Sequence, residues 1–133
     1  MNSLARDAKT LGCLSPGPKL LRQLMRQPLG SPTLRVRSGG TSSRCAGDGS
    51  WTLDLSRHRE FLHHEATKEV EFGTGLTMAE LLQAMRASGR SLPIGLSGLT
   101  GSGFILSGGM GPLSRSQGLA LDHITAIEGI WGS

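Results

Sequence analysis

Apolar and polar residues alternate in three short stretches of the chain, which is the pattern of half-buried β-strands. The first stretch covers residues 33–37 and leads directly into two glycines, the second covers residues 51–56, and the third covers residues 68–73. A weaker alternation over residues 124–131 predicts a last strand. The pattern therefore predicts several short strands in small sheets.

Two other stretches have apolar residues three and four positions apart, which is typical of an amphipathic helix. After the proline and glycine residues of positions 15–18, one apolar face carries Leu20, Leu21, Leu24 and Met25. Further on, Thr77 and Glu80 have the spacing of a capping box, in which each side chain satisfies a backbone N–H of the other residue. We expect a helix that begins at Thr77 and stops at Gly89.

The residues between the second and third strands carry many charges and three histidines, His58, His63 and His64. Three histidines raise the question of a metal site, but no cysteine or carboxylate completes a recognisable ligand spacing. We therefore expect an exposed hairpin connection in this stretch.

Composition limits the chain to one domain, because 133 residues with 37% hydrophobic content can bury only a moderate core. Residues 1–14 show no clear period and are expected to form a tail or a weak first strand. No apolar run is long enough to span a bilayer, and the amino terminus lacks the apolar core of a signal peptide. We expect a cytoplasmic protein without membrane contact.

The formal net charge of +4 is unevenly placed, since the first fifty residues hold eight Lys or Arg against two acidic residues. Such a bias can mark a nucleic-acid surface. The basic residues are scattered and lack interleaved aromatic residues for base stacking, which favours a solvated face or the neighbourhood of an anionic cofactor. Cys13 and Cys45 fit neither a disulfide framework nor a zinc site, so we expect free thiols.

Glycine is the residue type that points to a function. The chain contains 20 glycines, and seven of them fall within residues 95–111, while Gly39 and Gly40 follow the first strand. Glycine permits positive φ angles and lets a ligand approach backbone N–H groups, so two such loops near each other suit phosphate and a flat cofactor. Glycines that only serve turns or close packing are the alternative.

The two familiar phosphate-binding motifs are absent. Gly101-Ser102-Gly103 is followed by Leu106 where a dinucleotide fingerprint needs its third glycine, and no Lys-Ser or Lys-Thr follows at the Walker spacing. A cofactor site here would therefore use another arrangement of loops.

The order of several motifs resembles the PCMH-type FAD-binding domain, over about residues 33–131. These motifs are Arg-Ser-Gly-Gly-Thr-Ser at residues 37–42, Asp-Leu-Ser at 54–56, Gly-Thr-Gly at 73–75, and the glycine-rich string at 92–122. Within that family the chain is most similar to the berberine-bridge-enzyme-like branch of flavin oxidoreductases.

The resemblance implies an α+β fold of small sheets flanked by helices, spanning residues 15–133 and incomplete at its C-terminus. It implies FAD as the cofactor, with the pyrophosphate on the backbone N–H groups of the first loop and the rest of the dinucleotide on the later loops. The cofactor-binding residues that it implies are Ser38, Gly39, Gly40, Thr41, Ser42, Thr100, Gly101, Gly103, Gly108, Gly109 and Ile130.

Two positions depart from the family pattern. Thr41 stands where covalently flavinylated members have histidine, and Ser97 stands where doubly linked members have cysteine. Neither side chain is expected to bond to the flavin, so the resemblance implies noncovalent FAD.

The family's substrate domain and catalytic base lie downstream of this module, so no catalytic residue is assigned. A companion chain or domain would then supply the site for an organic substrate. We predict the flavin module of an FAD-dependent oxidoreductase, in which the flavin accepts a hydride from that substrate. The alternatives are an inactive remnant that binds a nucleotide or a partner protein through an exposed sheet edge, and a basic nucleic-acid binder.

Overall fold

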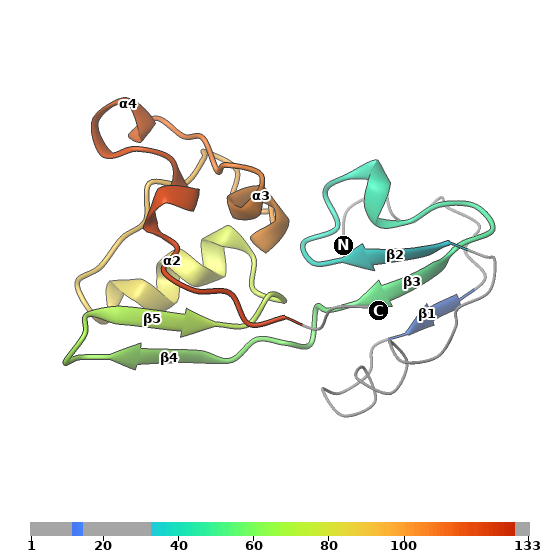
Figure 1. The fold of residues 1–133 in the computed structure, drawn as a ribbon, viewed down its shortest axis with the longest axis horizontal. Coiled ribbons are helices and arrows are strands. Elements are labelled where there is room, and N and C mark those ends of the chain that lie inside the picture. The colour runs from blue at the N-terminus through green and yellow to red at the C-terminus, as the bar shows by residue number, and fades with distance from the viewer. Residues whose placement is uncertain (1–11, 15–32, 130–133) are drawn as a thin grey trace.

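The computed structural model describes residues 12–14 and 33–129. Two groups of elements lie side by side along its longest axis, a three-stranded sheet at one end and a two-stranded sheet with helices at the other (Figure 1). Small sheets flanked by helices are the α+β arrangement that the family resemblance implies.

The first sheet is parallel and has the strand order β1-β3-β2. It consists of β1 (Gly12–Leu14), β2 (Leu34–Arg37) and β3 (Trp51–Asp54), with the 3-10 helix η2 (Ser43–Cys45) between β2 and β3. β3 is the central strand, and Thr52, Leu53 and Asp54 on it are buried. The strands predicted at residues 33–37 and 51–56 are confirmed as β2 and β3, and β1 lies within the stretch expected to be a tail or a weak first strand.

The second sheet is an antiparallel hairpin of β4 (Phe61–His64) and β5 (Glu69–Phe72). One face of the hairpin, with Phe61, Val70 and Phe72, packs against the core that includes α2 (Met78–Arg86). Strand β5 confirms the prediction for residues 68–73.

Both predicted ends of α2 are confirmed. The Thr77 N–H donates to Glu80 Oε2 at 2.9 Å, and the Glu80 N–H donates to Thr77 Oγ1 at 3.4 Å, which is the reciprocal pattern of a capping box. At the other end Gly89 has a φ of 65°, and the Arg90 N–H donates to the Met85 carbonyl at 3.2 Å. This is a Schellman termination, which needs the left-handed conformation that glycine adopts without a Cβ penalty.

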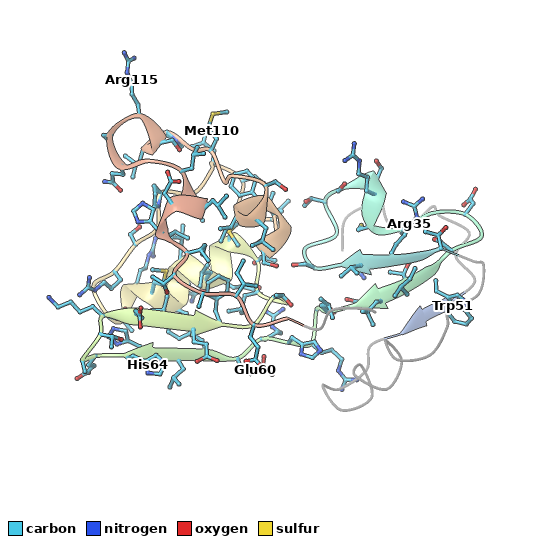
Figure 2. The ribbon with its side chains drawn as sticks, in the orientation of Figure 1. Arg35, Trp51, Glu60, His64, Met110 and Arg115 are labelled. Carbon is cyan, nitrogen blue, oxygen red and sulfur yellow. The ribbon has the colours of Figure 1, made fainter. Side chains whose placement is uncertain are left out.

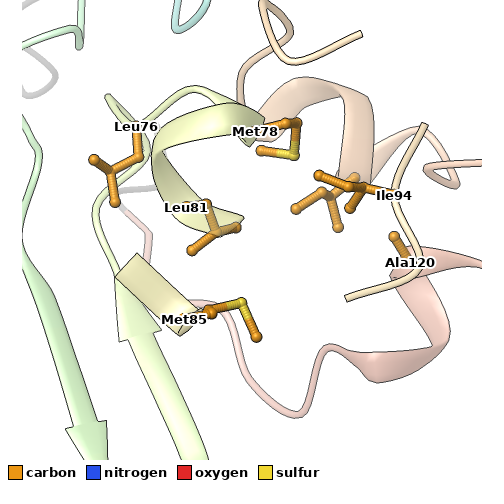
Figure 3. Packing of buried hydrophobic residues seen from close by; sticks show 7 residues of the cluster. Leu76, Met78, Leu81, Met85, Ile94 and Ala120 are labelled. Carbon is orange, nitrogen blue, oxygen red and sulfur yellow. The ribbon is translucent and has the colours of Figure 1, made fainter. Parts of the chain in front are cut away.

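The main core lies between α2 and the glycine-rich segment. Figure 3 shows its buried members, which are Leu76, Met78, Leu81, Met85, Ile94, Ile105 and Ala120. The short helices α3 (Ser102–Leu106) and α4 (Ser114–Gln117) and the 3-10 helix η3 (Ala120–His123) follow along the chain. Ile105 anchors α3 in this core, although the abundance of glycine gave no sign of a helix there. In the described part of the chain, no helix is both long enough and apolar enough to cross a membrane.

The expected hairpin connection around the histidines is wrong. His63 and His64 belong to strand β4, and only residues 65–68 connect it to β5. The reason is that Phe61 and His63 alternate with more exposed residues and pair with Phe72 and Val70 across the hairpin. Because many residues nearby are charged, this alternation of partly buried and exposed positions was not recognised in the sequence.

The expected last strand is wrong over residues 124–129, which form no helix or strand. A strand requires a neighbour for its backbone N–H and C=O groups, and none of the described strands pairs with this segment. Residues 130–131 and the helix predicted after residue 18 lie outside the described residues.

Candidate functional site

The two glycine-rich segments are in direct contact. The loop after β2 packs against the segment that leads into α3, as an added Cβ on Gly39 would overlap the backbone nitrogen of Gly101. A Cβ on Gly101 would in turn overlap the Gly39 nitrogen and the Ser38 hydroxyl. Both positions therefore require glycine, and the structure brings Ser38, Gly39, Thr100 and Gly101 together.

The Ser38 hydroxyl joins three segments of the chain. It donates to the Thr74 carbonyl at 2.5 Å and accepts from the Ser102 N–H at 3.2 Å. The Ser102 hydroxyl lies 3.3 Å from both Ser38 Oγ and the Thr74 carbonyl. The first loop, the turn before α2 and the start of α3 are thus tied to one another at a half-buried point.

The first turn of α2 also contacts residues 98–101, the part of the glycine-rich segment that leads into α3. Thr77 and Gly101 form an isolated antiparallel bridge, and the Met78 N–H donates to the Thr100 carbonyl at 2.8 Å. The Ala79 N–H donates to the Gly98 carbonyl at 3.0 Å. These N–H groups are therefore used within the protein, and they fix the position of residues 98–101.

Three backbone N–H groups of the first loop have no backbone acceptor among the described residues. Gly40 is buried and has a φ of 74°, so this turn requires the left-handed conformation. Within residues 33–129, the N–H groups of Gly39, Gly40 and Thr41 donate to no backbone carbonyl. The loop ends at Ser42, whose hydroxyl accepts from the Arg44 N–H at 3.1 Å to start η2. Adjacent N–H groups in such a loop suit an anion such as a pyrophosphate.

The Arg37 side chain packs against the first loop at Gly40. Its guanidinium donates to Asp54 at 2.8 Å, and the two side chains are only 17% and 12% exposed. A Cβ on Gly40 would lie 2.7 Å from Arg37 Nε, so the loop closes over the arginine. Arg37 therefore has a structural role. On the same strand, Arg35 (Figure 2) donates to the Arg44 carbonyl at 3.2 Å and ties η2 to the sheet.

The glycines of the later loop divide into two kinds. Gly109 has a φ of 67° and a Cβ there would lie 2.5 Å from Ala120 Cβ, so it serves close packing. Gly103 has no atom within 4 Å of an added Cβ, and Gly108 has only Leu119 Cδ1, at 3.8 Å. No atom of the described chain would exclude a side chain at position 103, so packing does not require glycine there. Open backbone of this kind fits a flat ligand that approaches closely.

Helix α3 connects the two parts of the predicted site. Gly101 is its N-cap residue, and Gly108 follows the Ser107 cap at its other end. Sequence reasoning missed Ser102 and the contact role of Thr74, which lie beside Gly101 and Gly75. A serine or threonine directly beside a glycine in a glycine-rich segment is the sequence pattern that could have identified them.

Three further positions named from the sequence are Thr41, Ser97 and Ile130. Thr41 is half-buried in the first loop, and Ser97 is exposed, with its carbonyl accepting from Thr100 Oγ1 at 3.2 Å. Ile130 lies outside the described residues. No three His, Cys, Asp or Glu side chains among the described residues gather as metal ligands.

The comparisons with known proteins agree with one another. The family profile of the FAD binding domain matches residues 31–131. The FAD-linked oxidoreductase janO of Penicillium janthinellum is 32% identical over 132 residues, covering 96% of this chain and 29% of the relative. Aclacinomycin-N/aclacinomycin-A oxidase of Streptomyces galilaeus is 32% identical over 100 residues, covering 71% of this chain and 18% of the relative.

The fold is also found among solved structures. A variant of berberine bridge enzyme superposes with a TM-score of 0.76 at 27% identity, covering 93% of this chain and 26% of that one. The chain therefore spans less than a third of the length of these relatives and neighbours.

Proposed function

Since the chain belongs to the FAD binding domain family, we propose that it holds FAD noncovalently between its two glycine-rich segments, as the flavin module of an oxidoreductase. The predicted resemblance to PCMH-type domains and to berberine-bridge-enzyme-like oxidoreductases is confirmed, and FAD is the cofactor of this family. The observation that carries the proposal is the direct contact of Ser38 and Gly39 with Gly101, beside N–H groups of the first loop that donate to no backbone carbonyl of the described residues.

The pyrophosphate of FAD would accept hydrogen bonds from the N–H groups of Gly39, Gly40 and Thr41, with Ser38 and Ser42 at either end of the loop. Several converging donors are needed because the pyrophosphate carries two negative charges. Thr100, Gly101, Gly103, Gly108, Gly109 and Ile130 would line the rest of the dinucleotide.

Noncovalent binding follows from the side chains at the two linkage positions. Thr41 and Ser97 have hydroxyl groups, where the covalently linked members have an imidazole and a thiol. A hydroxyl is the weaker nucleophile, so neither residue is expected to bond to the flavin.

FAD bound here would supply redox chemistry by accepting a hydride from an organic substrate. The protein residues would bind and orient the cofactor, and the substrate site would come from a companion chain or a further domain. The domain expected at residues 15–133 would extend to include β1, because residues 12–14 pair with β3.

Gly103 offers a sharp test. In the free protein Gly103→Ala should be stable or gain about 0.5 kcal/mol, because alanine is the better helix former and its Cβ meets no atom within 4 Å. With FAD against this backbone, the added methyl group should weaken FAD binding at least tenfold. Titration of FAD by fluorescence quenching measures the affinity, and thermal unfolding measures the stability.

Gly49→Ala is the matched control. Gly49 has a φ of 64° and lies in the turn before β3, so alanine there should destabilise the fold by about 1 kcal/mol and leave FAD affinity unchanged. Equal FAD affinity of the Gly103→Ala variant and the unchanged chain would remove Gly103 from the site. A folded chain that binds no FAD would leave the nucleotide- or partner-binding remnant as the better account.

A further inference from the structure

A pocket lies at the end of α2 opposite to the one that contacts the glycine-rich segments. It is formed between the C-terminal half of α2 and the β4–β5 hairpin, and its volume is about 410 Å³. Pockets of roughly 300–1,000 Å³ are the usual size for small-molecule sites. The glycine loops contact α2 at Thr77 and Met78, whereas this pocket is lined by Ala84 and Ala87. The two sites are therefore separate.

His63 lines the pocket and carries a buried polar atom without a hydrogen-bond partner in the described part of the chain. His63 Nε2 is buried, and within the described residues it makes no hydrogen bond. His63 shares the inner face of the hairpin with Phe61, because the two residues are two positions apart on β4. A buried ring nitrogen without a partner is costly, and a polar group of a ligand in the pocket would satisfy it.

The rim of the pocket is mainly cationic. Lys68 and Arg90 both line it, against the single acidic residue Glu65. Among the described residues, neither cation lies within ion-pair distance of a carboxylate. Lys68 also has a φ of 62°, which is strained for a residue other than glycine.

The inner wall is apolar. The Phe61 ring and the methyl groups of Ala84 and Ala87 supply it. A charged rim, one buried polar atom and an apolar wall together select a ligand with an anionic head and a flat apolar body.

We propose that this pocket binds a small organic carboxylate. The carboxylate accepts a hydrogen bond from His63 Nε2–H and pairs with Lys68 and Arg90, while its apolar body lies on Phe61 and the two alanines. Binding here is independent of FAD, because none of these residues takes part in the contact between the glycine loops.

Benzoate is a suitable probe, and benzamide is its neutral analogue. We expect benzoate to shift the backbone amide NMR signals of Phe61, His63 and Arg90 in the ¹⁵N-labelled 133-residue chain, in a saturable way. Benzamide should bind at least tenfold more weakly because it lacks the charge. Absence of saturable shifts, or equal binding of the two probes, would overturn the proposal.

Lys68→Gly separates an effect on binding from an effect on folding. Glycine relieves the strain of the positive φ, so this variant should unfold at the same or a higher temperature. Its affinity for benzoate should nevertheless fall about tenfold, because the cation is lost. His63→Ala should also lose affinity, and His63→Gln should recover part of it by restoring a donor.

His64→Ala is the matched control, because His64 is the next residue of β4 and its side chain is on the opposite face, where it lies 3.6 Å from Glu71 (Figure 2). It should bind benzoate as the unchanged chain does. If Lys68→Gly and His63→Ala keep full benzoate affinity, the proposed site is wrong.

Discussion

The Ser38 hydroxyl is the residue-scale feature on which the proposed FAD site depends most. It accepts from the Ser102 N–H and donates to the Thr74 carbonyl, so it holds the first loop against the start of α3 before any cofactor arrives. Preformed donors reduce the ordering cost of binding. We therefore propose Ser38 as a positioning residue, in addition to the backbone role that the sequence predicts for it.

Ser38→Ala should lower both stability and FAD affinity. The substitution leaves the Ser102 N–H without its acceptor, which costs about 1–3 kcal/mol for a buried donor. Thermal unfolding and FAD titration measure the two effects. Ser116→Ala is the control, since the Ser116 hydroxyl is exposed and donates only to the Leu113 carbonyl at 3.1 Å. Similar losses in the two variants would contradict a special role for Ser38.

Glycine positions show how much of the site the sequence could reveal. The sequence identified Gly39 and Gly101 as candidates, but only the fold shows that their backbones touch each other. It also could not separate Gly109, which serves packing against Ala120, from Gly103, whose missing side chain leaves open space. That distinction depends on neighbours that are distant in sequence.

At the scale of elements, α2 links the core to the proposed site. Its first turn is fixed by the capping box and by an ion pair between Arg59 and Glu80. Hydrogen bonds from the Thr77 N–H and the Thr77 hydroxyl, followed by Arg59, lower the pKa of the Glu80 carboxyl below its ordinary value. The ionised carboxylate therefore stabilises the helix start that holds Thr100.

This pKa shift predicts a loss of stability in acid. A carboxyl whose pKa is lowered by folding stabilises the protein above its unfolded pKa of about 4.3, and the gain disappears as pH falls through the folded pKa. The unfolding temperature should therefore fall as pH is lowered from about 5 to 3, and Glu80→Gln should reduce this dependence. Glu69→Gln, at an exposed position of β5, is the control. An unchanged pH profile in Glu80→Gln would contradict the assignment.

The sequence predicted those elements whose ends are set by residues close to each other along the chain. The capping box and Gly89 define α2 because caps are formed by residues close in sequence. Strand β4 was missed because the charged residues around His63 hid its alternation. The strand expected after Ile124 is absent over residues 124–129, since alternation alone supplies no neighbouring strand.

At the scale of the whole molecule, most of the large apolar side chains that are exposed among the described residues belong to the glycine-rich string at residues 92–122. Seven of the ten exposed large hydrophobic residues in the described chain fall between Leu96 and Leu121, and Leu96 is 92% and Met110 73% exposed (Figure 2). Exposed apolar side chains in such numbers favour an interaction surface. We propose that a companion chain or domain covers these side chains and supplies the substrate site.

The most direct test of the central claim is the visible absorption spectrum of the purified chain after incubation with FAD, desalting and acid precipitation. We predict a retained flavin band that passes into the supernatant, because the proposed site between the two glycine-rich segments holds FAD without a covalent bond. Flavin in the precipitate would contradict noncovalent binding at Thr41 and Ser97. A folded chain that retains no flavin after desalting would contradict the proposed FAD site itself.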